Sequence, residues 1–414
     1  YSYPFHPLLG LLSWLSKAFQ MTMIPMPEIE EIASQYPSSD SSNACVVPFA
    51  RTPSGSCNVF APIPRDLSIW YSQGIHLEDV LRAFRPVTDQ KLILFRLVGD
   101  TLVQITPQHS HLDADFGATE PACLAHAILS VLAKADLEDF DLVLNHGDLP
   151  ILRRTSEHPP FYGPTDREAR IPAPLFSICS SSSFWDILFP NVCRPQLVNM
   201  SNMSPVPWDK KRDVAFWRGT DRGAVNWAME ISDMYRGSPR KSFLDAVSPS
   251  EKFDVAFLED DLLNATVVNT DPNFVPLDRW PEWRYLLDLP GNGYSGSLKQ
   301  KLTSSSAVIL LTDMGISGVS PVYEHYHVGL KDQVHVLAVS AKTAEKKVQW
   351  ASDSPDRMQQ IVKEANEYMK DFDMISLCYI WRLLDQYAKL IRYKPGYIPN
   401  TAFGSGITSH TFYV

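Results

Sequence analysis

The sequence has no run of apolar residues that approaches the roughly 20 needed to cross a bilayer as a helix. It is also poor in charge, because charged residues make up only 20% of the chain and the formal net charge is -10. This balance excludes nucleic acid as a bulk partner, which would require a basic face. A single phosphate group remains possible, since a helix N-terminus and one or two cations bind phosphate whatever the global charge.

Several catalytic and metal signatures are missing as well. The serine run Ser180–Ser183 lacks the G-x-S-x-G context of a serine hydrolase. Glu324, His325 and His327 do not have zinc-ligand spacing and are expected on a helix face. The acidic run 259–261 is typical of a solvated loop rather than a metal site. None of these three runs is therefore expected to hold a metal or to form a serine hydrolase site.

Cysteines are few but even in number: Cys45, Cys57, Cys123, Cys179, Cys193 and Cys378. Cys45 with Cys57, and Cys179 with Cys193, are spaced like small disulfide loops, although spacing does not establish connectivity. Three glycosylation sequons begin at Asn199, Asn202 and Asn264. Together these features favour the secretory pathway lumen, in the Golgi or the endoplasmic reticulum.

A chain of 414 residues is too long for one ordinary core, which predicts two domains of comparable size. Because the sequence opens at Tyr1 rather than Met, we expect a targeting segment or anchor to have been removed, and membrane contact only through it. Residues 5–19 are predicted to form an amphipathic helix that packs on the protein's own body. With the Pro- and Ser-rich stretch 37–66, this makes residues 1–66 a helical arm and linker.

The first domain is predicted over residues 67–205. A hairpin is expected over 91–105, turning at Gly99-Asp100, followed by a helix over 120–135 and a buried strand over 140–144. Asp148 then lies just beyond the carboxyl end of a strand, where α/β folds place working residues. Asp148 either caps a turn or acts as a general base, and His146 is the rival base.

The second domain is predicted over residues 206–395, with residues 396–414 as a tail. Strands are expected at 213–217, 253–258, 282–289, 307–311 and 333–339, and helices at 297–304, 353–370 and 375–392. Strands that alternate with helices indicate an α/β fold in both domains.

A glycine-rich turn is the sharpest local signal. Gly291, Gly293 and Gly296 fit G-x-G-x-x-G between a strand and a helix, and Asp313 follows at the end of the next strand. Taken literally, this pattern indicates a nicotinamide-dependent oxidoreductase. A structural tight turn explains the same glycines.

The residues around that turn suit an anion. Ser295 and Ser297 stand where a helix is predicted to begin, so they can cap the helix or hold a phosphate. Lys299 and Lys301 oppose the helix dipole, which is easier to explain if an anion binds nearby.

A second anion-binding candidate is Arg218, followed by Gly219 and Thr220 at a predicted strand end. Arginine presents a rigid fork that suits a diphosphate. The alternative is that Arg218 stacks on Trp217 and pairs with a carboxylate such as Asp221.

Ordered motifs over most of the chain resemble glycosyltransferase family 90, which contains the animal protein O-glucosyltransferases and the fungal capsule-associated xylosyltransferases. The strongest are APLFSICSSSSFWDILFP (173–190), AFWRGT (215–220), WRYLLDLPGNGYSGSLKQKLTSSSAVIL (283–310) and SPVYEHYHVGLKDQVHVLAV (320–339). Weaker echoes are His6-Pro7, PIPRDLSIWY (62–71) and NHGDLP (145–150).

The resemblance implies a GT-B fold, in which two Rossmann-like domains face a cleft, with the acceptor on the first and the nucleotide sugar on the second. It implies an inverting, metal-independent transfer of xylose or glucose from a UDP-sugar to a hydroxyl of a protein or polysaccharide, with no cofactor besides the donor substrate. Asp148 would be the base. The donor would be bound by Arg218, Gly219, Thr220, Gly293, Ser295, Gly296, Ser297 and Lys299.

One position departs from many animal and fungal members, which carry an arginine where Ser297 stands. This leaves the donor sugar open. A family member that binds glycan or protein without turnover is the non-enzymatic alternative.

Overall fold

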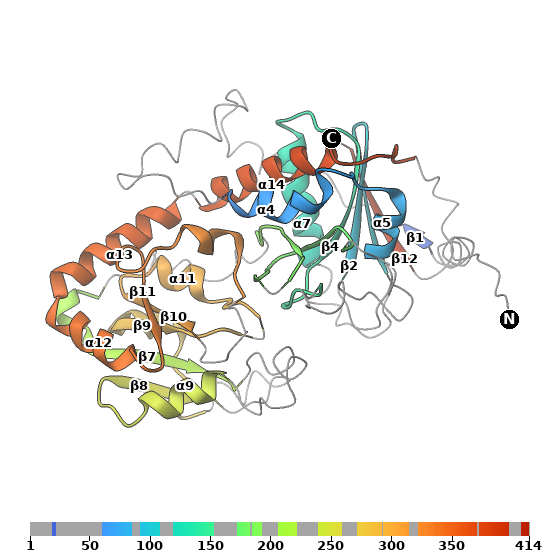
Figure 1. Ribbon diagram of the computed structural model, residues 1–414. Coiled ribbons are helices and arrows are strands. Elements are labelled where there is room, and N and C mark those ends of the chain that lie inside the picture. The colour runs from blue at the N-terminus through green and yellow to red at the C-terminus, as the bar shows by residue number, and fades with distance from the viewer. Residues whose placement is uncertain are drawn as a thin grey trace. The chain divides into compact units, whose positions relative to one another are not determined.

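The computed structural model describes residues 19–21, 60–84, 92–107, 119–152, 172–182, 184–192, 206–221, 239–258, 271–291, 293–313, 322–370, 372–396 and 407–413 (Figure 1). The chain forms two compact units. Unit 1 contains residues 1–180, 184–193 and 374–414, and unit 2 contains residues 181–183 and 194–373. The predicted GT-B arrangement concerns how two such units face each other, and it stays a prediction.

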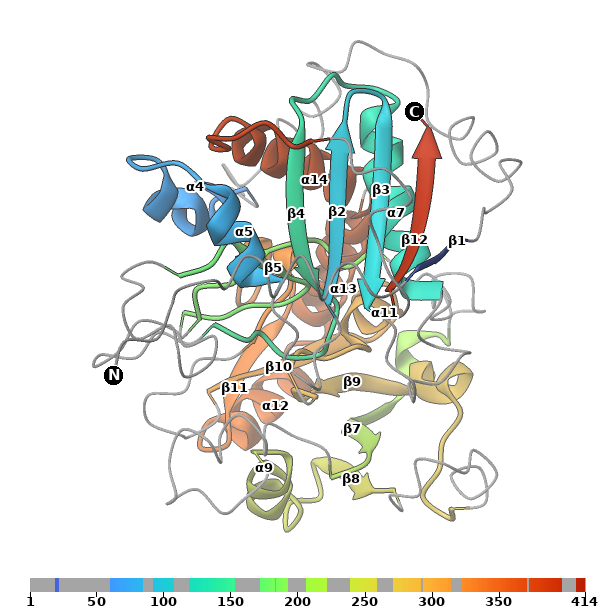
Figure 2. The same cartoon turned by 90° about the vertical axis from the view of Figure 1, so that its right-hand side faces the viewer.

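Unit 1 is built on a seven-stranded mixed sheet in the order β1-β12-β3-β2-β4-β5-β6 (Figure 2). Its strands are β1 (Phe19–Met21), β2 (Leu92–Val98), β3 (Thr101–Pro107), β4 (Phe140–Asn145), β5 (Leu175–Ser177), β6 (Ile187–Leu188) and β12 (Ile407–Tyr413). The hairpin prediction is confirmed, because β2 pairs antiparallel with β3 and Gly99 takes a φ of 54° in the turn. Glycine adopts that φ at no steric cost, because it has no Cβ atom.

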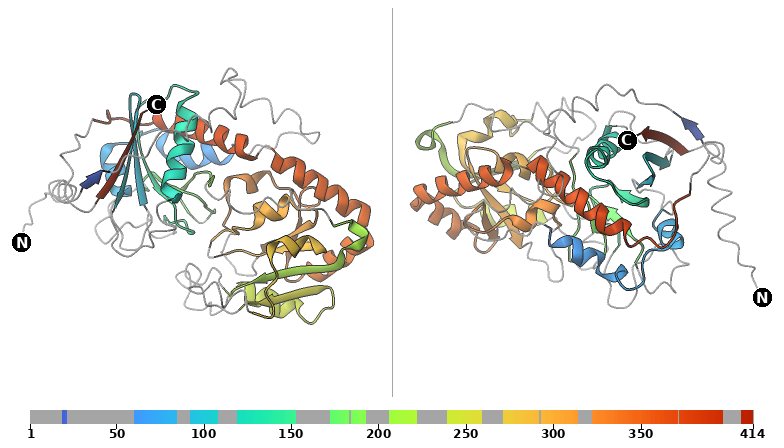
Figure 3. Two further views of the ribbon diagram at one scale, coloured as in Figure 1. Left: turned by 180° about the vertical axis from the view of Figure 1, so that it is seen from behind. Right: turned by 90° about the horizontal axis from the view of Figure 1, so that it is seen from above.

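The helices of unit 1 are α4 (Pro62–Leu67), η2 (Ser68–Trp70), α5 (Leu77–Ala83), α7 (Thr119–Leu132) and α14 (Phe372–Ala388), the last from Met374 onward. The amphipathic helix α7 runs along one face of the sheet (Figures 2 and 3). On α14, the Tyr387 hydroxyl donates a 2.8 Å hydrogen bond to the Asp141 carbonyl in β4. These contacts cover β4, whose six residues are all buried.

Unit 1 differs from the sequence prediction in three respects. The last long helix belongs here from Met374 onward and not to the second domain. The predicted tail supplies β12, which pairs along its whole length with β3. Because β2, β3 and β12 are joined by antiparallel pairings, the sheet is not a purely parallel Rossmann-like one. The predicted helix over 5–19 and the stretch 37–59 lie outside the described residues, apart from Phe19 in β1.

Unit 2 contains a fully parallel five-stranded sheet in the order β11-β10-β9-β7-β8. Its strands are β7 (Arg212–Gly219), β8 (Phe253–Phe257), β9 (Trp283–Asp288), β10 (Ala307–Asp313) and β11 (Leu337–Ser340). Its helices are η5 (Trp208–Lys210), α9 (Pro239–Val247), η6 (Leu277–Glu282), α11 (Leu298–Leu302), η7 (His325–Gly329), α12 (Ala344–Asp353) and α13 (Pro355–Lys370). All five strand predictions are confirmed, although β11 begins at Leu337 and not at residue 333.

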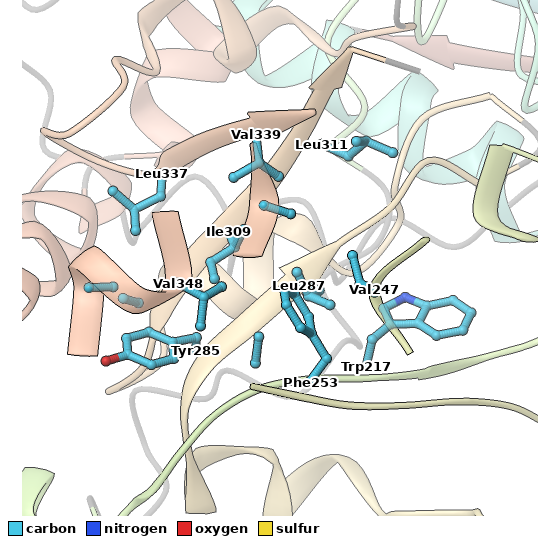
Figure 4. Packing of buried hydrophobic residues seen from close by; sticks show 14 of the residues in the cluster. Trp217, Val247, Phe253, Tyr285, Leu287, Ile309, Leu311, Leu337, Val339 and Val348 are labelled. Carbon is cyan, nitrogen blue, oxygen red and sulfur yellow. The ribbon is translucent and has the colours of Figure 1, made fainter. Parts of the chain in front are cut away.

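The sheet of unit 2 is buried on both faces. Successive side chains of each strand point to opposite faces, and both sets pack against other residues. Trp217, Leu287 and Ile309 point to one side, where they pack with Val247 of α9 and Val348 of α12 (Figure 4). Their neighbours Phe216, Leu286 and Val308 belong to clusters on the other side. Burial on both faces explains the continuous apolar runs in the sequence. In the described part of the chain, no helix is long and apolar enough to span a membrane.

The strand order creates a topological switch point in unit 2. The first strand, β7, has β8 on one side and β9 on the other, so the chain winds in opposite directions from β7. In open α/β sheets, ligands bind outside the carboxyl ends of the strands at such a point. Here β7 ends at Arg218-Gly219, and β9 runs into Pro290-Gly291. The two anion-binding candidates, far apart in sequence, therefore meet at one place.

Candidate active site

Asp148 lies in a tight segment after β4, as predicted. Asn145, the last residue of β4, accepts a 2.9 Å hydrogen bond from the Gly147 N–H and donates one of 2.7 Å to the Leu149 carbonyl. The segment thus turns around Asp148, whose side chain is exposed, whereas His146 is buried at 7% exposure. A base must reach its substrate, so exposure favours Asp148 over His146.

Cys179 contacts the same segment and corrects one expectation. It is a buried thiol that donates a 3.3 Å hydrogen bond to the Asp148 carbonyl oxygen. The spacing of Cys179 and Cys193 is therefore not the signature of a disulfide. Cys179 instead helps to fix the backbone at Asp148.

Arg218 is held by protein groups at the end of β7. Its guanidinium donates to the Trp217, Asp254 and Asn273 carbonyls and, at 2.5 Å, to the Asp254 carboxylate. It also lies 4.8 Å from the centre of the Phe216 ring. The alternative reading of a stacked and paired arginine is therefore the observed state, although with different partners. Residues 216 and 218 share a face of the strand, while Trp217 points to the other.

Gly219 and Thr220 continue from β7 into the switch point. A Cβ atom on Gly219 would lie 2.7 Å from the Trp217 ring, so this position requires glycine. The Thr220 carbonyl accepts a 2.7 Å hydrogen bond from Arg240 of α9, and Arg240 also donates to the Pro290 carbonyl at 2.7 Å. Arg240 thus ties together the segments that follow β7 and β9. Sequence reasoning missed it, because only the strand order brings those segments together.

The glycine-rich turn is closed by its own backbone. Gly291 N–H donates to the Tyr294 carbonyl at 3.1 Å, and a Cβ atom on Gly291 would approach that oxygen to 2.6 Å. This contact accounts for one glycine of the motif as a structural requirement. Gly293 and Gly296 lie in the same turn, which leads directly into α11.

Ser295 and Ser297 do not act as the predicted helix caps. Helix α11 has only five residues, Leu298–Leu302, and the Ser297 side chain makes no capping hydrogen bond. The Ser295 hydroxyl donates to Asp288 at 2.6 Å and lies 3.4 Å from the Ser297 hydroxyl. Asp288 is a buried carboxylate, and the Ser295 hydroxyl is one of its hydrogen-bond donors. Asp288 therefore orients the Ser295 hydroxyl, which in turn lies next to the hydroxyl of Ser297.

Two lysines of α11 pair with buried carboxylates. Lys301 Nζ lies 2.8 Å from Asp288, with both side chains 2% exposed. Burial lowers the pKa of Lys301, and Asp288 opposes that shift. Lys299 Nζ lies 2.8 Å from Glu324, whose side chain is fully buried, while that of Lys299 is 15% exposed. Each of the two lysines therefore has a carboxylate of the protein itself as a partner.

Glu324, His325 and His327 are structural residues around η7. The Glu324 N–H donates to His327 Nδ1 at 3.0 Å, closing a capping box. Burial lowers the pKa of both imidazoles. Among the described residues, no group of three or more histidine, cysteine, aspartate or glutamate side chains could hold a metal. The acidic run 259–261 lies outside them.

Asp313 ends β10, next to the carboxyl end of β9, and is exposed. This is the place that the dinucleotide fingerprint requires of an acidic residue. However, the crossover from β9 to β10 carries only the five-residue α11, which has little dipole to offer a pyrophosphate. The geometry therefore gives the oxidoreductase alternative little support.

Comparison with known proteins agrees with the motifs. The family model for glycosyl transferase family 90 matches residues 52–403. The chain is 25% identical over 285 residues to protein O-glucosyltransferase 2 of Danio rerio, covering 65% of this chain and 51% of that protein. It is 24% identical to protein O-glucosyltransferase 3 of Mus musculus over the same shares. The chain thus spans about half the length of the curated relatives it matches. Because the family model covers most of its length, the chain belongs to glycosyl transferase family 90.

Proposed function

We propose that this protein moves glucose or xylose from a UDP-sugar onto a hydroxyl of a protein or glycan acceptor, with inversion at the anomeric carbon and without a metal. The observation that carries this proposal is the switch point of unit 2, where Arg240 ties together the segments after β7 and β9. Ligands of open α/β sheets bind at such points. The matched relatives are named protein O-glucosyltransferases.

We assign general-base catalysis to Asp148. The acceptor hydroxyl oxygen would form a bond to the anomeric carbon as the bond from that carbon to the diphosphate oxygen breaks. The hydroxyl proton would pass to the Asp148 carboxylate, and UDP would leave with the electron pair of the broken bond. Attack from the side opposite the diphosphate inverts the configuration. The exposure of Asp148 and the fixed backbone around it support this role.

We assign donor binding to Gly219, Thr220, Gly293, Ser295, Gly296, Ser297 and Lys299, together with Arg218. Without a metal, the charge that develops on the leaving diphosphate must be stabilised by positioned cations and hydrogen-bond donors. Lys299 suits this role because Glu324 and the rings of Tyr326 and Phe372 hold its partly exposed ammonium group. Asp254 already fixes the Arg218 side chain, so binding a diphosphate would cost little further side-chain conformational entropy.

A luminescent UDP-release assay over a panel of UDP-sugars, run with and without EDTA, tests this function. We expect release from one of UDP-glucose or UDP-xylose that EDTA does not reduce. Binding of UDP without release from any donor, in the presence of peptide and glycan acceptors, would favour the non-catalytic alternative. If NADH binds and UDP does not, the transferase proposal fails.

Replacing Arg240 by Met should weaken UDP binding at least tenfold, because a hydrogen bond to a charged group contributes about 1.5–3 kcal/mol and about 1.4 kcal/mol is a factor of ten. The two segments that Arg240 joins would then move independently. Isothermal titration calorimetry with UDP measures the effect. Lys241→Met, which removes an exposed cation from the next position of α9, is the matched control and should bind UDP like the wild type. Equal affinities for the two variants would show that Arg240 does not organise the donor site.

We also propose a lumenal location in the secretory pathway. Cys123 and Cys378 each belong to a disulfide, and disulfides persist in oxidising compartments. The three sequons at Asn199, Asn202 and Asn264 lie outside the described residues, so their support comes from sequence alone.

A further inference from the structure

The geometry points to Asp186 as a positioning residue for Asp148: its buried carboxylate holds the far end of the segment that carries the base. This inference rests on the proposed role of Asp148. Asp186 lies just before β6 and is 1% exposed. It does not itself reach solvent, so it acts through the backbone it binds.

The carboxylate of Asp186 binds the chain three and four residues beyond Asp148. One oxygen accepts a 2.8 Å hydrogen bond from the Ile151 N–H, and the other accepts one of 2.7 Å from the Leu152 N–H. The first oxygen also accepts a 2.6 Å hydrogen bond from the Ser177 hydroxyl. Both oxygens of Asp186 are thus used as acceptors.

Ser177 carries the network to the near end of the segment. Its hydroxyl accepts a 3.0 Å hydrogen bond from the Asn145 side-chain amide. Asn145 in turn holds the Gly147 N–H and the Leu149 carbonyl, on either side of Asp148. Ser177 lies opposite Asn145 because β4 and β5 pair in parallel register. One connected set of side chains therefore forms hydrogen bonds to the backbone on both sides of Asp148.

A carboxylate at this place is costly for stability, which indicates a role beyond packing. In the described part of the chain no cation forms an ion pair with Asp186, and burial raises its pKa to about 6. Only an ionised carboxylate accepts from all three donors without presenting a hydrogen of its own. An asparagine would avoid the buried charge but would point its amide hydrogens at one of those donors. Sites that must be held to a fraction of an ångström require such support from a second layer of side chains.

Asp186→Asn is the direct test, measured by hydrogen exchange and by steady-state transfer. We expect faster exchange of the backbone amides at 147–149, 151 and 152 and a kcat lowered about a hundredfold, since a misplacement of about 1 Å can cost that much. The KM for the donor and the affinity for UDP should stay within twofold of the wild type, because the donor residues belong to unit 2. Asp136→Asn, an exposed carboxylate of the same unit, should change neither exchange nor kcat.

Ser177→Ala removes one donor and leaves the carboxylate, so it carries the test if Asp186→Asn does not fold. It should raise exchange over the same amides and lower kcat by about tenfold, and Ser177→Thr, which keeps the hydroxyl, should recover most of it. Unchanged exchange in both variants, or faster exchange with unchanged kcat, overturns the inference. If the wild type transfers no sugar, the proposed function has failed, and positioning of the segment is decided by exchange alone.

Discussion

Replacing Asp148 by Asn is expected to lower the rate of sugar transfer by about a hundredfold to ten-thousandfold, the range for loss of a general base. The carboxamide has nearly the same shape but cannot take the proton of the attacking hydroxyl. Because Asp148 is exposed and its backbone is held by neighbours, the substitution should leave the fold unchanged. UDP affinity should also be unchanged, since the donor residues belong to the other unit.

UDP release with saturating donor and acceptor measures this effect, and calorimetry with UDP checks the affinity. Asp100→Asn, in the exposed turn between β2 and β3, is the matched control for removal of a carboxylate. His146→Gln tests the rival base and should cost much less than Asp148→Asn, because the imidazole is buried. Transfer that survives in Asp148→Asn and is lost in His146→Gln would reverse the assignment.

Replacing Lys301 by Met should destabilise unit 2 by about 3–5 kcal/mol, the cost of breaking a buried ion pair from one side. Asp288 would remain 2% exposed, with the Ser295 hydroxyl as its donor and without the ammonium group that pairs with it. A buried carboxylate in that position either recruits a proton or draws in water. Both outcomes disturb the glycine-rich turn, so donor binding should weaken as well.

Urea unfolding followed by tryptophan fluorescence measures the loss, because Trp217 and Trp283 are buried in the same unit. Asp288→Asn combined with Lys301→Met removes both charges and should be more stable than Lys301→Met alone. Lys241→Met, at an exposed position of α9, controls for removal of a lysine. If the single and double variants unfold at the same urea concentration, the pair does not contribute in this way.

Much of the fold could be predicted because strands that are buried on both faces have continuous apolar runs in the sequence. The apolar runs at 140–144, 213–217 and 307–311 all form strands, and the helix predicted over 353–370 is α13. The helix α12 was missed since its apolar positions are few: Ala344, Val348 and Ala351 are its buried residues. The strand β12 was missed because its support comes from pairing with β3, whose partner residues lie 300 or more positions earlier in the chain.

The candidate site was predictable in composition but not in contacts. Asp148, Ser295 and Lys299 were all singled out, and each lies in the kind of segment expected. The partners were wrong wherever they depended on distant chain. Arg218 pairs with Asp254 of the neighbouring strand and not with Asp221, and Lys301 pairs with Asp288, a partner that the sequence did not suggest. Arg240 gave no local signal, and Asp186 lies in the family motif 173–190 without being singled out there.

By itself, the sequence determined the α/β class, the membership of glycosyl transferase family 90 and the short segments that carry the candidate chemistry. These follow from local periodicity and from ordered motifs, and both can be recognised without knowing which distant residues are in contact. Only the tertiary structure decided that the segments after β7 and β9 meet at one switch point, and that Asp148 is exposed while His146 is buried. The reason is physical: strand order, burial and the pairing of buried charges depend on residues that the chain brings together only when it folds.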